Sequence, residues 1–300
     1  MPVDIMIVGA QKSGTTSLLA YLGDHPSIEP QLQREMTWFT DPEQQPFPEQ
    51  FYFGSAAPGG LRLGKLAGLM YRPEAVARLA THNPNVAVLA ILRDPVERAY
   101  SSFWHMRGRG HEQTFSDFEQ AMREGIERAS SGVGSQTSYL EWSSYEPPIR
   151  RLQSRFGDAL SVLIFEEFVA DPVSVTLPLL QRWGLNIGAL SPDAPRENPS
   201  GGMRSHAAAR LTRARATRFA KRIIPPKARV ALRRQYVSAN LTASRPPPID
   251  RATERALRDL FREPNRRLED LLGRSIDVWA EPLHDQPSRS AVSQPDNDSH

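Results

Sequence analysis

The segment Asp4–Leu22, DIMIVGAQKSGTTSLLAYL, has the pattern of a buried strand, a glycine-containing turn and a helix. Residues 4–9 form an apolar run that ends in glycine, which is typical of a strand in a parallel sheet. Residues 17–23 continue as a helix, which ends before Pro26. Phosphate-binding loops join a strand to a helix in this way, because backbone N–H groups at the helix N-terminus attract anions.

The lysine in this turn is misplaced for a nucleoside triphosphatase. The P-loop pattern requires Gly, four residues, then Gly-Lys-Ser/Thr. Gly9 and Gly14 have this spacing, but Thr15 stands at the lysine position and Lys12 lies three residues earlier. The turn therefore predicts a site for a terminal phosphate-like group, with a purely structural turn as the alternative. The hydroxyl donors beside Lys12 are those of Ser13, Thr15, Thr16 and Ser17.

Composition excludes several classes of protein. The chain has 300 residues and no cysteine, so disulfides, thiolate metal sites and a cysteine nucleophile are excluded. No apolar run approaches the roughly 18 residues of a membrane span. The N-terminus lacks the layout of a signal peptide. We therefore expect a soluble, cytoplasmic protein that needs no metal and has no nucleic-acid partner.

Strands alternate with helices along the chain. A second buried strand is predicted at residues 86–92 and a third within ALSVLIFEEF, residues 159–168. This alternation favours an α/β, P-loop-like three-layer fold with a central parallel sheet flanked by helices. The helical patterns after the first one cover residues 72–84, 95–110, 145–158, 171–185 and 251–273.

The predicted domain covers residues 1–281, and the polar tail 282–300 is predicted to be disordered. Residues 41–60 and 106–140 are expected to be loops that carry acceptor specificity. Between residues 198 and 249 there are 12 Lys or Arg and no Asp or Glu. This basic helical segment is either a solvated amphipathic helix or a surface for an anionic or lipid-linked acceptor or a membrane.

A second motif, ILRDPVERAYSSF, follows the second strand. It places Arg93 at the carboxyl end of the strand, where open α/β sheets bind ligands. Ser101 lies about two helical turns later, so both side chains could face one anion. Asp94 is predicted to cap the helix, and Arg98 to form an ion pair with Asp94. Two anion sites at neighbouring strand ends suggest a nucleotide with 5′ and 3′ groups.

These motifs together resemble those of the sulfotransferases that use 3′-phosphoadenosine-5′-phosphosulfate (PAPS), in particular the branch of heparan sulfate and bacterial carbohydrate sulfotransferases. Residues 7–28 resemble the 5′-phosphosulfate loop of that family, and residues 91–103 its 3′-phosphate motif. REMTWF, residues 34–39, is similar to its Lys-Glu-x-x-Phe-Phe segment. Residues 162–172 and 260–273 resemble its later strand and its C-terminal helix.

The resemblance implies a role for each motif. Lys12 would contact the 5′-phosphate and the bridging oxygen, and the segment Ser13–Ser17, with Gly14, Thr15 and Thr16, would cradle the phosphosulfate. Arg93 and Ser101 would hold the 3′-phosphate. Glu35 falls at the position of the catalytic base, with a surface ion pair to Arg34 as the alternative. The resemblance implies no metal.

Other residues are weaker candidates for the site. Where the family has Gly-Glu-Lys/Ala-Ser-Pro-x-Tyr, this chain has GKLAGLMY, so Lys65 replaces the glutamate and could reach the sulfate or the acceptor. His105 is a rival base, and so is His25, which the turn before Pro26 favours as a structural residue. The remaining candidates are Tyr145 at the nucleotide pocket and Arg204 in NPSGGMRS.

The sequence thus predicts sulfuryl transfer from PAPS to a hydroxyl of a carbohydrate, glycolipid or related small molecule. Two alternatives stay open at this stage: a P-loop kinase-like phosphotransferase using ATP–Mg²⁺, and a catalytically silent nucleotide-binding protein. The basic segment 198–249 adds peripheral membrane contact as a further hypothesis. The sequence does not indicate the acceptor or the oligomeric state.

Overall fold

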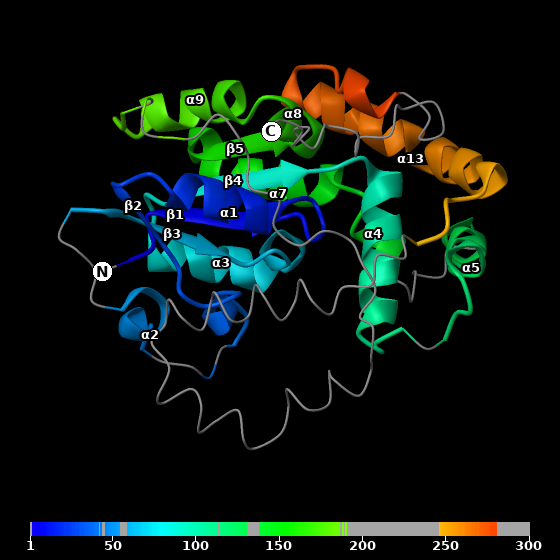
Figure 1. The fold of residues 1–300 in the computed structure, drawn as a ribbon, viewed down its shortest axis with the longest axis horizontal. Coiled ribbons are helices and arrows are strands. Elements are labelled where there is room, and N and C mark those ends of the chain that lie inside the picture. Colours follow the sequence, from blue (N-terminus) through cyan, green and yellow to red (C-terminus); the bar gives the residue numbers. More distant parts are fainter. Residues whose placement is uncertain are drawn as a thin grey trace, which may run out of the picture.

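The fold is built on a five-stranded parallel sheet with the strand order β2–β3–β1–β4–β5 (Figure 1). The strands are β1 (Ile5–Gly9), β2 (Ile28–Pro30), β3 (Leu61–Lys65), β4 (Ala87–Leu92) and β5 (Leu160–Ile164). The computed structural model describes residues 2–41, 43, 46–54, 59–112, 114–130, 138–186, 188, 190 and 246–280. Every residue of β1 is buried, as expected of an apolar central strand covered on both faces.

Helices cover both faces of the sheet. Because side chains alternate along a strand, Ile5 and Ile7 face one layer, while Met6 and Val8 face the other. The first face packs on α1 (Thr15–Gly23), α8 (Phe165–Ala170) and α9 (Pro172–Arg182). The second face packs on α3 (Pro73–His82), α7 (Glu146–Phe156) and the end of α13 (Arg251–Leu272). The predicted three-layer α/β fold is therefore confirmed.

A third apolar cluster lies at the end of the sheet to which the strands point (Figure 1). It joins α4 (Pro95–Gly108), α5 (Phe118–Ser130), α6 (Ser138–Glu141) and the first half of α13. Phe103, Phe118 and Leu257 lie at its centre with no exposed surface. Helix α4 is thus anchored beside the carboxyl ends of the strands, where ligands bind in open α/β sheets.

Short helices complete the described chain. They are α2 (Glu49–Phe53) and the 3-10 helices Thr37–Thr40, Leu69–Tyr71, Gly157–Ala159 and Asp277–Trp279. Helix α13 is one continuous helix despite Pro264; Asp250 caps its start, and Gly273 ends it with a φ of 66°. No helix among the described residues is long and apolar enough to cross a membrane.

The structure corrects three details of the predicted elements. The strand expected over residues 159–168 ends at Ile164, because Phe165 begins α8. The segment 106–140, expected to be a loop, contains α5 and the start of α6. The sequence did not predict strands β2 and β3, because neither has a clear apolar pattern. Strand β2 has only three residues, one of them a proline, and β3 contains Arg62 and Gly64.

Several predictions lie outside the described residues. The basic segment 198–249 is described only from residue 246, and Arg204 is not described. The tail 282–300 is not described either. The domain boundaries at residues 1–281 stay a prediction.

Candidate functional site

The loop between β1 and α1 makes a tight turn beneath α8. Lys12 and Gly14 have φ values of 72° and 83°, and the Ser13 N–H donates to the Ala10 carbonyl at 3.2 Å. A Cβ on Gly14 would lie 2.4 Å from Cδ2 of Phe165. Only glycine therefore fits this position, because the left-handed backbone and the ring both exclude a side chain.

The N-terminus of α1 has no side-chain cap. Gly14 is the N-cap residue, and the first turn holds no acidic residue. The hydroxyl residues Ser13, Thr15 and Ser17 are buried there. The first N–H groups of a helix have no partner within the helix, and the helix dipole adds a partial positive charge. This helix start can therefore bind an anion.

The Lys12 side chain, from this loop, contacts His105. Nζ of Lys12 lies 3.3 Å from Nδ1 of His105, on α4. Burial, followed by repulsion from Arg93, Arg109 and other arginines, lowers the pKa of Lys12 to about 8. Burial and the nearby Lys12 lower the pKa of His105 to about 3, so its ring is neutral and Nδ1 accepts from Lys12.

Arg93 leaves the carboxyl end of β4 toward the same loop. Its Nε and Nη2 donate to Oε2 of Glu97 at 2.9 and 2.5 Å, and Nη1 lies 3.5 Å from the Lys12 carbonyl. The guanidinium lies 5.2 Å from the ring centre of Phe165. Ser101 is buried two turns along α4. Lys12 and Arg93 therefore come together although 81 residues separate them.

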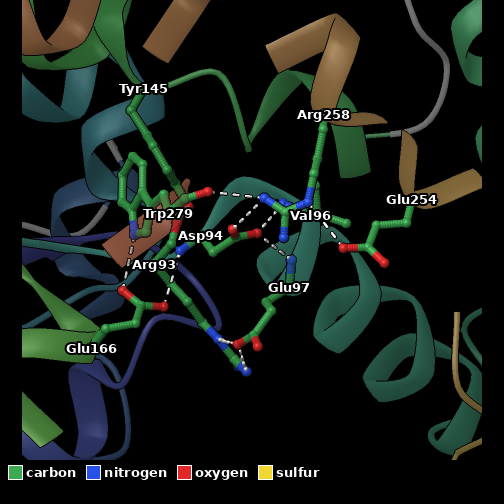
Figure 2. A network of polar contacts seen from close by, with 9 residues as sticks. All are labelled: Arg93, Asp94, Val96, Glu97, Tyr145, Glu166, Glu254, Arg258 and Trp279. Carbon is green, nitrogen blue, oxygen red and sulfur yellow. Dashed lines mark hydrogen bonds and ion pairs between the residues drawn. The ribbon is translucent and has the colours of Figure 1, made fainter. Parts of the chain in front are cut away.

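Buried polar groups hold the turn from β4 to α4 (Figure 2). The predicted cap is confirmed, since Oδ1 of Asp94 accepts from the N–H groups of Val96 and Glu97 at 2.8 and 3.0 Å. The Asp94 N–H donates to Oε1 of Glu166 at 3.1 Å, and Nε1 of Trp279 donates to Oε2 at 3.0 Å. Burial raises the pKa of both carboxyls, Asp94 and Glu166.

Helix α13 and Tyr145 bind the same turn. Nη1 of Arg258 donates to the Trp279 carbonyl at 2.9 Å and lies 3.4 Å from Oδ2 of Asp94, and Nε donates to Glu254 at 2.9 Å. The Tyr145 hydroxyl donates to the Arg93 carbonyl at 2.9 Å. The end of β4 is thus fixed from two sides, which limits the positions open to Arg93.

Glu35 forms an ion pair with Lys65. Nζ of Lys65 donates to Oε1 of Glu35 at 2.6 Å, and the Ala67 N–H donates to Oε2 at 2.9 Å. The Lys65 side chain is 2% exposed and that of Glu35 29%. Burial lowers the pKa of Lys65, and the Glu35 carboxylate partly opposes this. Each carboxylate oxygen of Glu35 thus accepts one hydrogen bond, while part of the side chain is exposed to solvent.

Three neighbouring strands bring these groups to one edge of the sheet. Lys65 ends β3 and pairs with Ile7 of β1, Lys12 follows β1, and Arg93 follows β4. Because the strands are parallel and adjacent, their carboxyl ends lie side by side. The cationic loop that contains Lys12 and the ion pair of Glu35 with Lys65 therefore follow neighbouring strands of the sheet.

Comparison with known proteins gives the family. The model of the family described as sulfotransferase domain matches residues 2–175. The chain belongs to this family. Bifunctional heparan sulfate N-deacetylase/N-sulfotransferase 4 of Mus musculus is 31% identical over 116 residues, covering 36% of this chain and 13% of that protein. Bifunctional heparan sulfate N-deacetylase/N-sulfotransferase 3 of Homo sapiens is 29% identical over 169 residues. This match covers 49% of this chain and 19% of that protein. The chain therefore spans less than a fifth of the length of these relatives.

A solved sulfotransferase has the same fold. The crystal structure of a sulfotransferase from Alicyclobacillus acidocaldarius matches with a TM-score of 0.63 and 21% identity, covering 94% of this chain and all of that one. At this identity the match establishes the fold alone. The resemblance to sulfotransferases inferred from the motifs is confirmed by the family match.

One predicted contact in this sulfotransferase domain is wrong, and Glu35 has a partner that the sequence did not indicate. Arg98 does not pair with Asp94; it donates to Ser143 and to the Tyr139 carbonyl, because its side chain turns into the cluster around α6. Glu35 pairs with Lys65 rather than standing as a surface partner of Arg34 alone.

His25 is a buried residue that holds its turn, as the sequence predicted. It is 2% exposed, its Nδ1 accepts from the Ser27 N–H, and its Nε2 lies 3.0 Å from the Asn186 carbonyl. Sequence reasoning missed Glu166, Arg258 and Trp279. They lie 72 or more residues from Asp94, and no local pattern marks them.

Proposed function

We propose that this protein transfers the sulfuryl group of PAPS to a hydroxyl of a carbohydrate, glycolipid or related small-molecule acceptor. The observation that carries the proposal is the meeting of Lys12, Arg93 and the Lys65–Glu35 pair at three adjacent strand ends of a sulfotransferase domain. A cationic loop next to a fixed carboxylate suits a reaction in which a hydroxyl loses a proton while a phosphate leaves.

The donor fits the groups present at the loop. The N-terminus of α1, which has no acidic residue in its first turn, favours an anionic end group. The pKa of Lys12 is lowered first by burial and then by the arginines around it, so positive charge is concentrated at this loop. In this assignment Lys12 and the segment Ser13–Ser17 hold the 5′-phosphosulfate. Arg93 and Ser101 hold the 3′-phosphate, for which a guanidinium and a hydroxyl are suitable donors.

Each catalytic group has one task. The acceptor oxygen forms a new bond to sulfur as the bond from sulfur to the bridging oxygen breaks, and the electron pair leaves with the phosphate. Lys12 stabilises this developing charge. Glu35 takes the proton of the acceptor hydroxyl, and Lys65 orients the Glu35 carboxylate by its 2.6 Å hydrogen bond. His105, neutral and 3.3 Å from Lys12, orients the ammonium group.

The proposed class of acceptor is supported by the names of the relatives. The curated relatives are named as heparan sulfate N-sulfotransferases, which motivates a carbohydrate or related acceptor here, whereas the hydroxyl as the accepting group stays a prediction from the sequence. The basic segment 198–249 remains a candidate for an anionic or lipid-linked acceptor or for a membrane surface, and the cytoplasmic location remains a prediction.

Nucleotide binding tests the donor. We expect 3′-phosphoadenosine-5′-phosphate (PAP), the product nucleotide, to raise the melting temperature of the protein, while ATP–Mg²⁺ has little effect. Lys12→Ala and Arg93→Ala should each lose PAP affinity, since a charged hydrogen bond contributes about 1.5–3 kcal/mol. Stabilisation by ATP–Mg²⁺ but not by PAP would instead support a kinase-like protein.

Transfer tests the catalysis. Labelled PAPS incubated with glycan and lipid extracts should give a labelled acceptor. Glu35→Gln should lower the rate about 10²–10⁴-fold with PAP affinity unchanged. An active Glu35→Gln variant would remove Glu35 as the base, and PAP binding without any transfer would indicate a catalytically silent protein.

A further inference from the structure

Arg98, on α4, is a buried cation without an ion pair among the described residues. Its exposed fraction is 0%. Nε donates to Oγ of Ser143 at 2.7 Å and Nη2 to the Tyr139 carbonyl at 2.6 Å. Nη1 has no hydrogen-bond partner in the described part of the chain. The partners that Arg98 does have are therefore neutral groups.

The ionisable groups that act most strongly on the pKa of Arg98 do not neutralise it. They are Tyr71, Tyr145, Arg93 and Tyr139. Burial raises the pKa of each of the three tyrosines, so these side chains stay uncharged, and Arg93 is itself positive. Burying a charge without a counter-charge costs free energy, so a site of this kind calls for an anion.

Arg98 and the loop after β1 are linked through Tyr145 and Lys12. Tyr145 links the two, since its hydroxyl donates to the Arg93 carbonyl at 2.9 Å. Burial raises the pKa of Tyr145, and the Arg98 guanidinium and Ser13 partly oppose this effect. Arg98 also contributes to the lowered pKa of Lys12. The buried charge therefore acts on the same space as the cations of the loop.

We propose that the phosphates of the bound donor nucleotide supply the counter-charge of Arg98, so that Arg98 strengthens nucleotide binding through space without touching the nucleotide. This inference rests on the proposed function. In the interior of a protein, charges interact over longer distances than in water, because the effective dielectric constant is lower. The positive charges of Arg98, Arg93 and Lys12 repel one another, and the negative charge of a bound nucleotide offsets this repulsion.

The first test replaces the charge with a side chain of similar length. Arg98→Met should weaken PAP binding about tenfold in calorimetric titration, the size of one charge interaction at intermediate dielectric. The melting temperature without nucleotide should stay within a few degrees of the wild type, or rise. Arg98→Lys keeps the charge and should retain most of the PAP affinity. Equal PAP affinity of Arg98→Met and wild type would overturn the inference.

A second pair of variants decides the case if Arg98→Met does not fold. Ser143→Asp places a carboxylate beside Nε of Arg98, and Ser143→Asn is its neutral match in size. Ser143→Asp should melt higher than Ser143→Asn and bind PAP more weakly. Equal PAP affinity of these two variants would also refute the role of Arg98. Failure of the wild type to bind PAP, in contrast, would contradict the proposed function itself.

Discussion

At the scale of single residues, the site depends on side chains that hold one another. The Glu35 carboxylate accepts hydrogen bonds from Lys65 and from the Ala67 N–H. Lys12 is held beside His105 by a 3.3 Å contact. Orienting reacting groups before the reaction lowers the barrier, because less freedom is lost in the transition state. Lys65, which supports the proposed base, should therefore affect rate more than nucleotide affinity, whereas His105, which contacts Lys12, should affect both.

Lys65→Met tests the support of Glu35. The substitution keeps the length of the side chain but removes the hydrogen bond to Oε1. We expect the transfer rate to fall about 10²-fold, as for a small displacement of a reacting group. PAP affinity should change little. Lys65→Arg should restore part of the rate, and an unchanged rate in Lys65→Met would show that Glu35 needs no such partner.

Lys12 predicts a pH effect on binding. With its pKa lowered to about 8 by burial and neighbouring arginines, Lys12 is largely neutral at about pH 8.5 in the free protein. A bound phosphate favours the ammonium form, so the nucleotide complex takes up a proton and PAP affinity falls as the pH rises above this pKa. Calorimetry in buffers of different ionisation enthalpy measures the uptake. The Lys12→Arg variant should take up no proton, and a wild type without uptake would contradict the lowered pKa.

At the scale of elements, the loop from β1 to α1 has little freedom. Its shape depends on Gly14, whose backbone is left-handed and whose missing side chain leaves room for Phe165 on α8. The same ring lies 5.2 Å from the Arg93 guanidinium. Phe165 therefore links the loop after β1 with the end of β4, so one side chain contacts both of the predicted anion sites.

Gly14→Ala tests this control. The Cβ would need a left-handed backbone and would overlap the Phe165 ring, so we expect a loss of about 3 kcal/mol in the free energy of unfolding, together with a loss of PAP binding. Urea denaturation measures the first effect. Gly108→Ala is the control, since a Cβ there meets no atom within 4 Å, and its stability should stay within about 1 kcal/mol of wild type. Wild-type stability of Gly14→Ala would contradict the structure of the loop.

At the scale of the whole molecule, helix α13 and the segment after it contact the turn from β4 to α4, far away in the sequence. Arg258 of α13 contacts Asp94 at the start of α4, and Trp279 donates to Glu166 behind the same turn (Figure 2). These contacts cross 164 and 113 residues of sequence. The family model ends at residue 175, so α13 lies beyond the matched region and still supports the predicted nucleotide site.

Arg258→Met tests this long-range support. It removes the cation that contacts the buried carboxylates of Asp94 and Glu254, so we expect the free energy of unfolding in urea to fall by about 2–4 kcal/mol and PAP binding to weaken. Arg262→Met is the matched control on the same helix. Arg262 is 77% exposed and pairs with Asp259 at the surface, so its loss should cost at most about 1 kcal/mol. Equal stabilities of the two variants would mean that α13 does not support the turn.

The sequence by itself determined the sulfotransferase fold class, the strands β1 and β4, and the helices that follow them. Apolar runs, glycine turns and helix caps are local patterns, and each can be recognised from a few neighbouring residues. The Asp94 cap and the sharp turn at Gly14 could be predicted for the same reason. The candidate roles of Lys12, Arg93 and Glu35 followed from the motifs.

Only the tertiary structure decided which side chains meet. The pairing of Lys65 with Glu35, the burial of Arg98 among neutral groups and the contact of Arg258 with Asp94 all join segments 30 or more residues apart. Such contacts depend on strand order and on the packing of whole helices, and no local pattern specifies them. The sequence thus predicted the charged groups of the site, whereas the fold determined their partners and therefore the protonation of Lys12.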